Sequence, residues 1–160
     1  MRILIAAAGK LKDDEERGIV ARYTKRFDQS GKPLGLGPLT ILEFPESRAA
    51  SVGARKADEA TRLLKATADS GLIIALDAEG RHYGSDVFAK LLGKQADSGV
   101  KSCAFLIGGP DGHGDEVLKA ADFKLALGHM TLPHGLARVV LVEQLYRAAT
   151  ILAGHPYHRG

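Results

Sequence analysis

Short apolar runs alternate with longer amphipathic segments along the chain, and no other feature of the sequence limits the possible folds so strongly. Most runs are apolar at nearly every position, which is typical of strands buried on both faces of a sheet. Strands that alternate with helices favour an α/β fold with a mostly parallel sheet covered by helices. The expected strands span 2–8, 39–44, 72–76, 102–107 and 123–126, and the expected helices span 14–28, 54–68, 85–97, 115–121 and 136–153.

The ends of these elements carry recognisable signals. Ser85 is expected to be the N-cap of the third helix, because its hydroxyl can accept from a free N–H in the first turn. Gly154 is expected just past the last helix, where a left-handed residue often ends the helical hydrogen bonding. Residues 30–38 are rich in Gly and Pro, and they predict a surface loop without regular structure.

Composition sets broad limits. The 160 residues, 45% of them hydrophobic, suit a single domain over residues 1–160. No apolar run approaches the roughly 20 residues of a membrane helix, so we expect a soluble protein without a membrane partner. The one cysteine, Cys103, lies in an apolar run, which favours a packing role and a reducing, cytoplasmic setting. The net charge of +3 permits an anionic partner such as RNA without demonstrating one.

Three irregular segments are expected to follow strand ends, and they are the candidate walls of one ligand pocket. Residues 77–80 follow the third expected strand, residues 108–114 follow the fourth, and residues 127–135 precede the last helix. In open α/β sheets a ligand lies just outside the carboxyl ends of the strands. We therefore expect these three segments to meet at one end of the sheet.

Two of these segments have a composition that suits ligand binding. Residues 108–114 include four glycines, which either let backbone amides approach a ligand or form a tight strand-to-helix turn. Their spacing matches neither G-x-G-x-x-G nor the P-loop, so phosphate binding is disfavoured. Residues 127–135 mix apolar side chains with free backbone polar groups, which suits an adenine as well as an ordinary connection.

Arg138 stands out in the last expected helix, because it falls on the apolar stripe that includes Leu141 and Leu145. An arginine there must snorkel, pair with a carboxylate, or meet an anionic or carbonyl-bearing ligand, since an unpaired buried charge costs several kcal/mol. Both a structural and a ligand-binding role are open.

Other polar groups are weaker candidates. The tail carries His155, Tyr157, His158 and Arg159, which form either a solvated end or an arm that stacks on a base and contacts phosphate. A metal site built from histidines is disfavoured, because the spacing of His129, His134, His155 and His158 matches no familiar ligand pattern. A basic stripe on the first helix suits solvent or an RNA backbone, and it comprises Arg17, Arg22, Lys25 and Arg26.

Several segments together resemble one family. The segments are 1–12, 105–112, 130–134, 143–148 and 155–159. In this order and at this chain length they look like the large-subunit rRNA pseudouridine-N3 methyltransferases, known as RlmH, of the SPOUT superfamily. Each motif alone is weak, but the combination spans nearly the whole chain.

The resemblance implies a SPOUT-type α/β fold with a deep C-terminal trefoil knot, an exception to the rule that chains do not thread their own loops. It implies a homodimer that binds S-adenosylmethionine within residues 72–153, without a metal, and acts on 23S rRNA in the ribosome or large subunit. The residues that the resemblance assigns to S-adenosylmethionine are Leu76, Gly108, Leu127, Gly128, His129, Met130, Thr131 and Leu132.

The implied substrate suggests a mechanism. N3 of a pseudouridine is a poor nucleophile until it loses its proton, so the enzyme must align the two substrates and assist deprotonation. We expect Arg138 to stabilise the developing imidate oxygen, and His155, Tyr157 or His158, from either subunit, to position the base. The sequence identifies no general base.

Three other functions are considered. The first is a SPOUT methyltransferase for another rRNA or tRNA nucleotide, which shares the cofactor and the knot. The second is a non-catalytic ribosome-binding protein, which predicts RNA binding without cofactor binding. The third is a metal-dependent hydrolase that uses the histidines.

Overall fold

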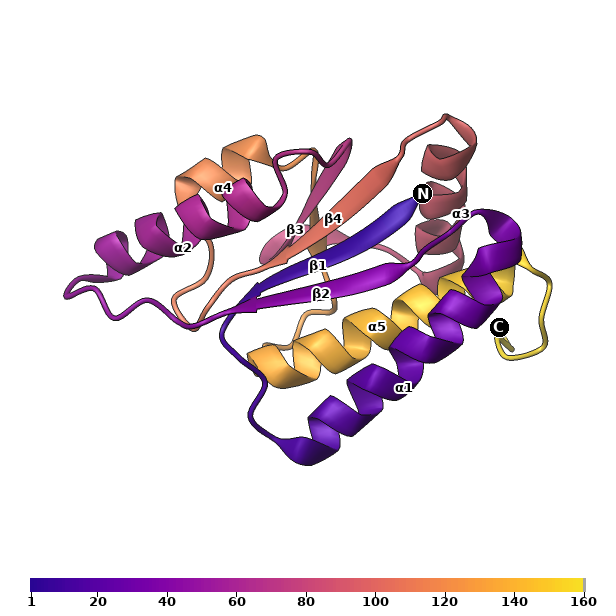
Figure 1. Ribbon diagram of the computed structural model, residues 1–160, viewed down its shortest axis with the longest axis horizontal. Helices are drawn as coiled ribbons and strands as arrows, with labels where there is room; N and C mark the ends of the chain where they lie inside the picture. Colours follow the sequence, from indigo (N-terminus) through magenta and orange to yellow (C-terminus); the bar gives the residue numbers. More distant parts are fainter. Residues whose placement is uncertain (160) are drawn as a thin grey trace.

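The computed structural model describes residues 1–159 of the chain as one parallel sheet with helices on both faces (Figure 1). The sheet has the strand order β2-β1-β4-β3-β5, and every neighbouring pair is parallel. The predicted α/β class is therefore confirmed. The strands are β1 (Arg2–Ala8), β2 (Leu39–Phe44), β3 (Leu72–His82), β4 (Ser102–Ile107) and β5 (Phe123–Ala126).

The helices form a layer on each side of the sheet. Figure 1 shows α1 and α5 side by side on one face and α2 and α4 together on the other. Within residues 1–159, none of the helices combines the length and the apolar character needed to cross a membrane. The helices are α1 (Asp14–Gly31), a short 3-10 helix η1 (Lys32–Leu34), α2 (Val52–Ala66), α3 (Ser85–Asp97), α4 (Asp115–Ala120) and α5 (His134–Leu152).

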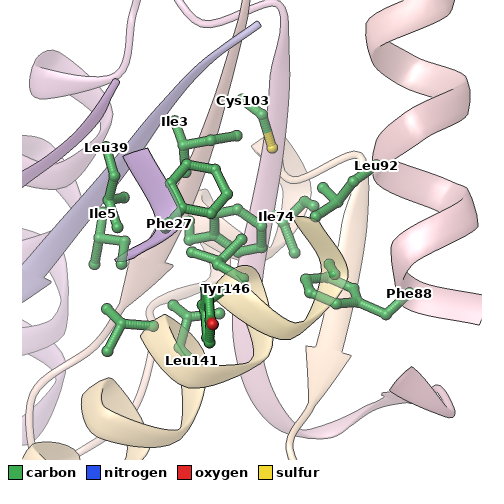
Figure 2. Close-up of a cluster of buried hydrophobic side chains, with 14 of the residues drawn as sticks. Ile3, Ile5, Phe27, Leu39, Ile74, Phe88, Leu92, Cys103, Leu141 and Tyr146 are labelled. Carbon is green, nitrogen blue, oxygen red and sulfur yellow. The ribbon is translucent and has the colours of Figure 1, made fainter. Parts of the chain in front are cut away.

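The two faces of the sheet carry side chains of different size, because successive residues of a strand point to opposite faces. Ile5 and Phe105 join the larger cluster beneath α1, α3 and α5, where Figure 2 shows side chains from strands and helices meeting. Ala6 and Ala75 point the other way, into the smaller cluster with α2 and α4. Alanines project little, so helix side chains such as Leu63 lie directly over the strands.

Cys103 lies in the larger cluster and is fully buried (Figure 2). Burial, the main cause, raises the pKa of its thiol to about 12, so the sulfur stays protonated at neutral pH. The predicted packing role of this residue is confirmed.

Strand β3 is longer than predicted. The expected strand ends at Leu76, but β3 continues to His82 after a register shift between Leu76 and Arg81. A side chain on Gly80 would lie 2.8 Å from the backbone of Leu125, so glycine is needed where β3 crosses β5. The prediction was wrong here because this extension pairs with β5 through its backbone and carries few apolar side chains.

The expected surface loop at residues 30–38 also differs. Helix α1 runs three residues further, to Gly31, and η1 follows it directly. Leu36 is buried, and its N–H donates to the carbonyl of Gly31 at 2.9 Å. The prediction of a structureless surface loop was wrong because this leucine anchors the segment in the core.

Helix ends follow local capping. Ser51 is the N-cap of α2 and accepts from the Ala54 N–H at 3.1 Å, so the helix starts earlier than expected. Helix α3 begins at Ser85, but its N-cap is Gly84, which corrects the predicted cap. Gly154 has a φ of 66°, and its neighbour His155 donates to the Thr150 carbonyl at 2.9 Å. This Schellman motif confirms the predicted C-terminal glycine.

The trefoil knot that the resemblance implies stays a prediction, because the strand order alone does not test it. The order places β5 at the edge of the sheet, next to β3, and α5 follows this edge strand in the chain.

An ion pair between a buried guanidinium and a partly exposed carboxylate fixes the first turns of α5 to the sheet. The Arg138 side chain is fully buried and donates to the Glu43 carboxylate at the end of β2. Its second terminal nitrogen donates to the Gly9 carbonyl at 2.9 Å, just past β1. Burial lowers the pKa of Arg138, and the Glu43 carboxylate opposes this effect. Of the roles left open by the sequence, the structure shows the carboxylate pairing.

We expect Arg138→Met to lower the free energy of unfolding by about 2 kcal/mol, because Glu43 and the Gly9 carbonyl lose their charged hydrogen-bond donor. Adding Glu43→Leu removes both charges, so the double variant should regain much of that loss. Urea unfolding of the two variants measures the difference. Equal losses in the single and the double variant would contradict a coupled ion pair.

Candidate functional site

A cavity of about 580 Å³ lies at the carboxyl ends of β3, β4 and β5. The three segments expected to form a pocket all contribute to its wall, because parallel strands bring their carboxyl ends to one edge of the sheet. Its size falls in the range of cavities that hold cofactors. The lining residues are 76–78, 107–110, 112–113, 125, 127–128, 130–134 and 137.

Nearly all of the residues assigned to S-adenosylmethionine lie around this cavity. Leu76, Gly108 and Leu127 line it, as do Gly128, Met130, Thr131 and Leu132. His129 does not line the cavity; it is exposed, and its ring stacks on that of His82 with centroids 4.0 Å apart. The structure thus brings the assigned residues together except for this histidine.

Gly108 fits the tight strand-to-helix turn, one of the two roles that the glycines of this segment allow. A side chain there would lie 3.0 Å from the Gly112 backbone and 3.2 Å from the His113 nitrogen. Glycine therefore lets residues 108–114, here called the glycine loop, fold back on themselves. Substitution of Gly108 would reshape the loop rather than only obstruct a ligand.

His113 is a buried residue of the cavity wall that the sequence did not single out. Its Nε2 lies 3.1 Å from the Leu106 carbonyl, and it must carry the proton there because a carbonyl only accepts. Within residues 1–159, Nδ1 has no hydrogen-bond partner. Burial, the largest influence, lowers the pKa of His113, so the ring is neutral at pH 7.

The tail, residues 155–159, follows the C-terminal end of α5, whereas the cavity lies at the start of this helix. The Tyr157 hydroxyl donates to Glu143 at 3.0 Å, and its ring packs on Tyr146 with centroids 4.6 Å apart. His158 Nδ1 lies 3.3 Å from an Arg147 nitrogen. Burial raises the pKa of the Tyr157 phenol, and the hydrogen bonds to Tyr23 and Glu143 add to this rise. The phenol is therefore neutral at physiological pH.

Within one chain the tail does not reach the cavity. The cavity includes His134 and Ala137 at the start of α5, whereas the tail follows its end. A helix of 19 residues is about 28 Å long. The predicted catalytic residues of the tail therefore lie apart from the cofactor residues. Arg138, the other predicted catalytic residue, follows the lining residue Ala137 but does not itself line the cavity.

The histidines do not form a metal site in the described part of the chain. His134 is at the start of α5, and His155 and His158 follow its end. Across residues 1–159, no three His, Cys, Asp or Glu side chains gather as they would around a metal ion. These residues therefore supply no set of metal ligands for a metal-dependent hydrolase.

The basic stripe of α1 is exposed, as its sequence pattern predicts. Arg17 and Lys25 line a groove between α1 and β2. The guanidinium of Arg26 lies 5.5 Å from the centre of the Tyr23 ring. The stripe is thus available to an anionic partner but lies over a different surface from the cavity.

The buried neutral ring of His113 predicts a pH dependence of stability. Its folded pKa lies below 6.5, so the unfolded chain takes up a proton first as the pH falls. The neutral His113 ring contributes fully to the free energy of unfolding above about pH 6.5, and this contribution is lost as the pH drops toward the folded pKa. His113→Gln, which keeps a donor for Leu106, should lose less free energy of unfolding between about pH 8 and about pH 6 than the wild type. The prediction is wrong if the free energy of unfolding, measured with urea, changes equally with pH in the wild type and in His113→Gln.

Comparison with known proteins agrees with this geometry. Residues 1–158 match the family described as "Predicted SPOUT methyltransferase". Two proteins named "Ribosomal RNA large subunit methyltransferase H" are similar over 159 residues, with 99% of both chains covered: 47% identity for Brucella anthropi and 48% for Xanthobacter autotrophicus. The structure of a probable methylase family protein from Haemophilus influenzae has a TM-score of 0.56 at 17% identity, over 99% of this chain and 70% of that chain, and supports the fold. The chain therefore belongs to the SPOUT methyltransferase family.

Proposed function

We propose that the chain is an S-adenosylmethionine-dependent methyltransferase of large-subunit ribosomal RNA. The observation that carries the proposal is the cavity at the strand ends, lined by most of the residues that the family resemblance assigns to the cofactor. The name of the two similar proteins, which cover almost the entire chain, supports ribosomal RNA as the substrate. The finer proposal is methylation at N3 of a pseudouridine in 23S rRNA, on ribosomes or large subunits in the cytoplasm, by a single SPOUT domain over residues 1–160.

The cavity suits the proposed cofactor. Leu76, Leu127 and Leu132 offer apolar walls for an adenine, and the backbone around them can recognise its polar edge without a dedicated side chain. When bound, S-adenosylmethionine supplies a methyl group already activated by its sulfonium. The task left to the protein is to orient the acceptor and to manage its proton.

The acceptor side of the reaction would use the tail and Arg138. The tail offers His155, Tyr157 and His158 as groups that stack on a base or hold it by hydrogen bonds. Because the Tyr157 phenol is neutral, it would orient the base as a donor rather than remove the proton. Because the Arg138 side chain is fully buried, it can stabilise the developing imidate oxygen only if substrate binding exposes it. A folded neutral variant at Arg138 with an unchanged methylation rate would contradict that role.

A homodimer is part of the proposal because the tail and the cavity of one chain lie at opposite ends of α5. If both serve one reaction, a second copy must bring its tail to the cavity. A twofold dimer does this symmetrically, since each copy gives its tail and receives the other.

A bulky side chain in the cavity should prevent both cofactor binding and methylation. Ala78 is exposed and lines the cavity, so Ala78→Trp should fill ligand space without disturbing the core. We expect the wild type to bind S-adenosylmethionine in a calorimetric titration and to methylate large subunits, and Ala78→Trp to do neither. Ala50→Trp, at an exposed position outside the cavity lining, is the control and should behave as the wild type.

The outcomes separate the competing functions. A methyl group mapped to N3 of a pseudouridine supports the finer proposal, whereas a product on another rRNA or tRNA nucleotide supports the first alternative. Binding to ribosomes without binding of S-adenosylmethionine would support the non-catalytic alternative and contradict the enzyme.

Mixed dimers of two inactive variants can show whether the tail of one copy acts at the cavity of the other. Ala78→Trp damages the cavity and Tyr157→Ala damages the tail, so each variant alone should be inactive. When the two are unfolded and refolded together, half of the dimers are mixed, and each mixed dimer has one intact site if tails are exchanged. Methylation should then recover to about a quarter of the wild-type rate. No recovery would mean that each tail serves its own cavity.

A further inference from the structure

Helix α2 holds the glycine loop from the side that faces away from the cavity. Gly109, Pro110 and Gly112 line the cavity, whereas the carboxylate of Asp111 between them is bound to α2. Arg55 Nε donates to one carboxylate oxygen at 2.6 Å, and Nη2 donates to the other at 3.3 Å. This bidentate pair fixes both the distance and the orientation of Asp111. The shared hydrogen bond lowers the pKa of Asp111 and raises that of Arg55.

Glu59 makes a second attachment one helical turn later, on the same face of α2. Its side chain is buried, and its carboxylate accepts from the Ser47 N–H at 2.9 Å and the Gly109 N–H at 3.3 Å. A side chain on Gly109 would lie 2.8 Å from the carboxylate, so only glycine allows this approach. One buried carboxylate thus joins the segment before α2 to the glycine loop.

These contacts restrain a loop that its own sequence leaves free. The four glycines of residues 108–114 allow many backbone conformations, and ordering them costs conformational entropy. Both attachments come from residues at least 50 positions away in the chain, so they form only when α2 is packed on the sheet. The folded protein therefore holds the loop in one shape before any ligand arrives.

We propose that Arg55 and Glu59 are positioning residues that preset the glycine loop for S-adenosylmethionine, an inference that rests on the proposed function. A loop already in its binding shape loses less entropy when the ligand binds. Without the attachments the loop spends only part of its time in that shape, and the affinity falls by the same fraction. The groups proposed to act on the acceptor belong to the tail and α5, so they keep their places.

The expected signature is a loss of affinity without a loss of chemistry. In the full-length protein, Arg55→Gln and Asp111→Ala should each raise the Kd and the KM for S-adenosylmethionine about tenfold. At saturating S-adenosylmethionine, kcat should stay within about twofold of the wild type. Glu59→Gln keeps one acceptor oxygen, so it should weaken binding less than Glu59→Ala. Hydrogen exchange of residues 108–114 should be faster in Arg55→Gln and Asp111→Ala than in the wild type, without added ligand.

An exposed ion pair on α3 provides the control. Lys90 lies 3.9 Å from Asp86 with i,i+4 spacing, and this pair does not contact the glycine loop. Asp86→Asn should therefore leave the Kd unchanged. Exchange of the charges, with Arg55→Asp and Asp111→Arg together, should recover part of the affinity, which a merely disrupted helix would not do.

The outcomes of this experiment are distinct from those of the proposed function. A wild type that binds S-adenosylmethionine while Arg55→Gln and Asp111→Ala bind equally well overturns the positioning role and leaves the proposed function intact. A wild type that binds no S-adenosylmethionine overturns both. Unchanged hydrogen exchange in residues 108–114 overturns the proposed ordering of the loop whether or not the ligand binds.

Discussion

The guanidinium of Arg138 joins the first turns of α5 to the residue after β1 and to the end of β2. A charge this deeply buried is stable only with its partners in place, so the start of α5 has little freedom to shift. Residues 130–134 form a wall of the cavity immediately before that point. An ion pair that does not line the cavity thereby determines where one of its walls lies.

The larger features of the fold could be predicted because they depend on runs of apolar residues. Strands β1, β2, β4 and β5 begin and end as predicted; glycine follows β1 and β4, and proline flanks β2 on both sides. The second half of β3 could not be predicted, because backbone pairing with β5 rather than side-chain burial maintains it. The same holds for residues 30–38, where one buried side chain, Leu36, outweighs the composition of its neighbours.

The candidate site was predictable where it follows from topology, and not where it follows from contacts between distant segments. The rule that ligands lie at the carboxyl ends of parallel strands brought 77–80, 108–114 and 127–135 to one cavity. No spacing in the sequence reveals that Glu59 lies under Gly109, or that His129 turns from the cavity to stack on His82. Likewise, the periodicity of α5 identified Arg138 as unusual, but only the fold shows that Glu43 is its partner.

Cys103 lends the chain a property unrelated to its proposed chemistry. It is the only sulfhydryl in the sequence, and it lies on a central strand with no exposed surface and a pKa raised to about 12. An alkylating reagent therefore finds no target in the native protein, and local opening of loops or helix ends does not uncover one. Modification requires the helices over this face of the sheet to move away from it, so its rate reports large-scale opening of the core. The rate at which Cys103 is alkylated therefore measures how often the folded protein opens its core.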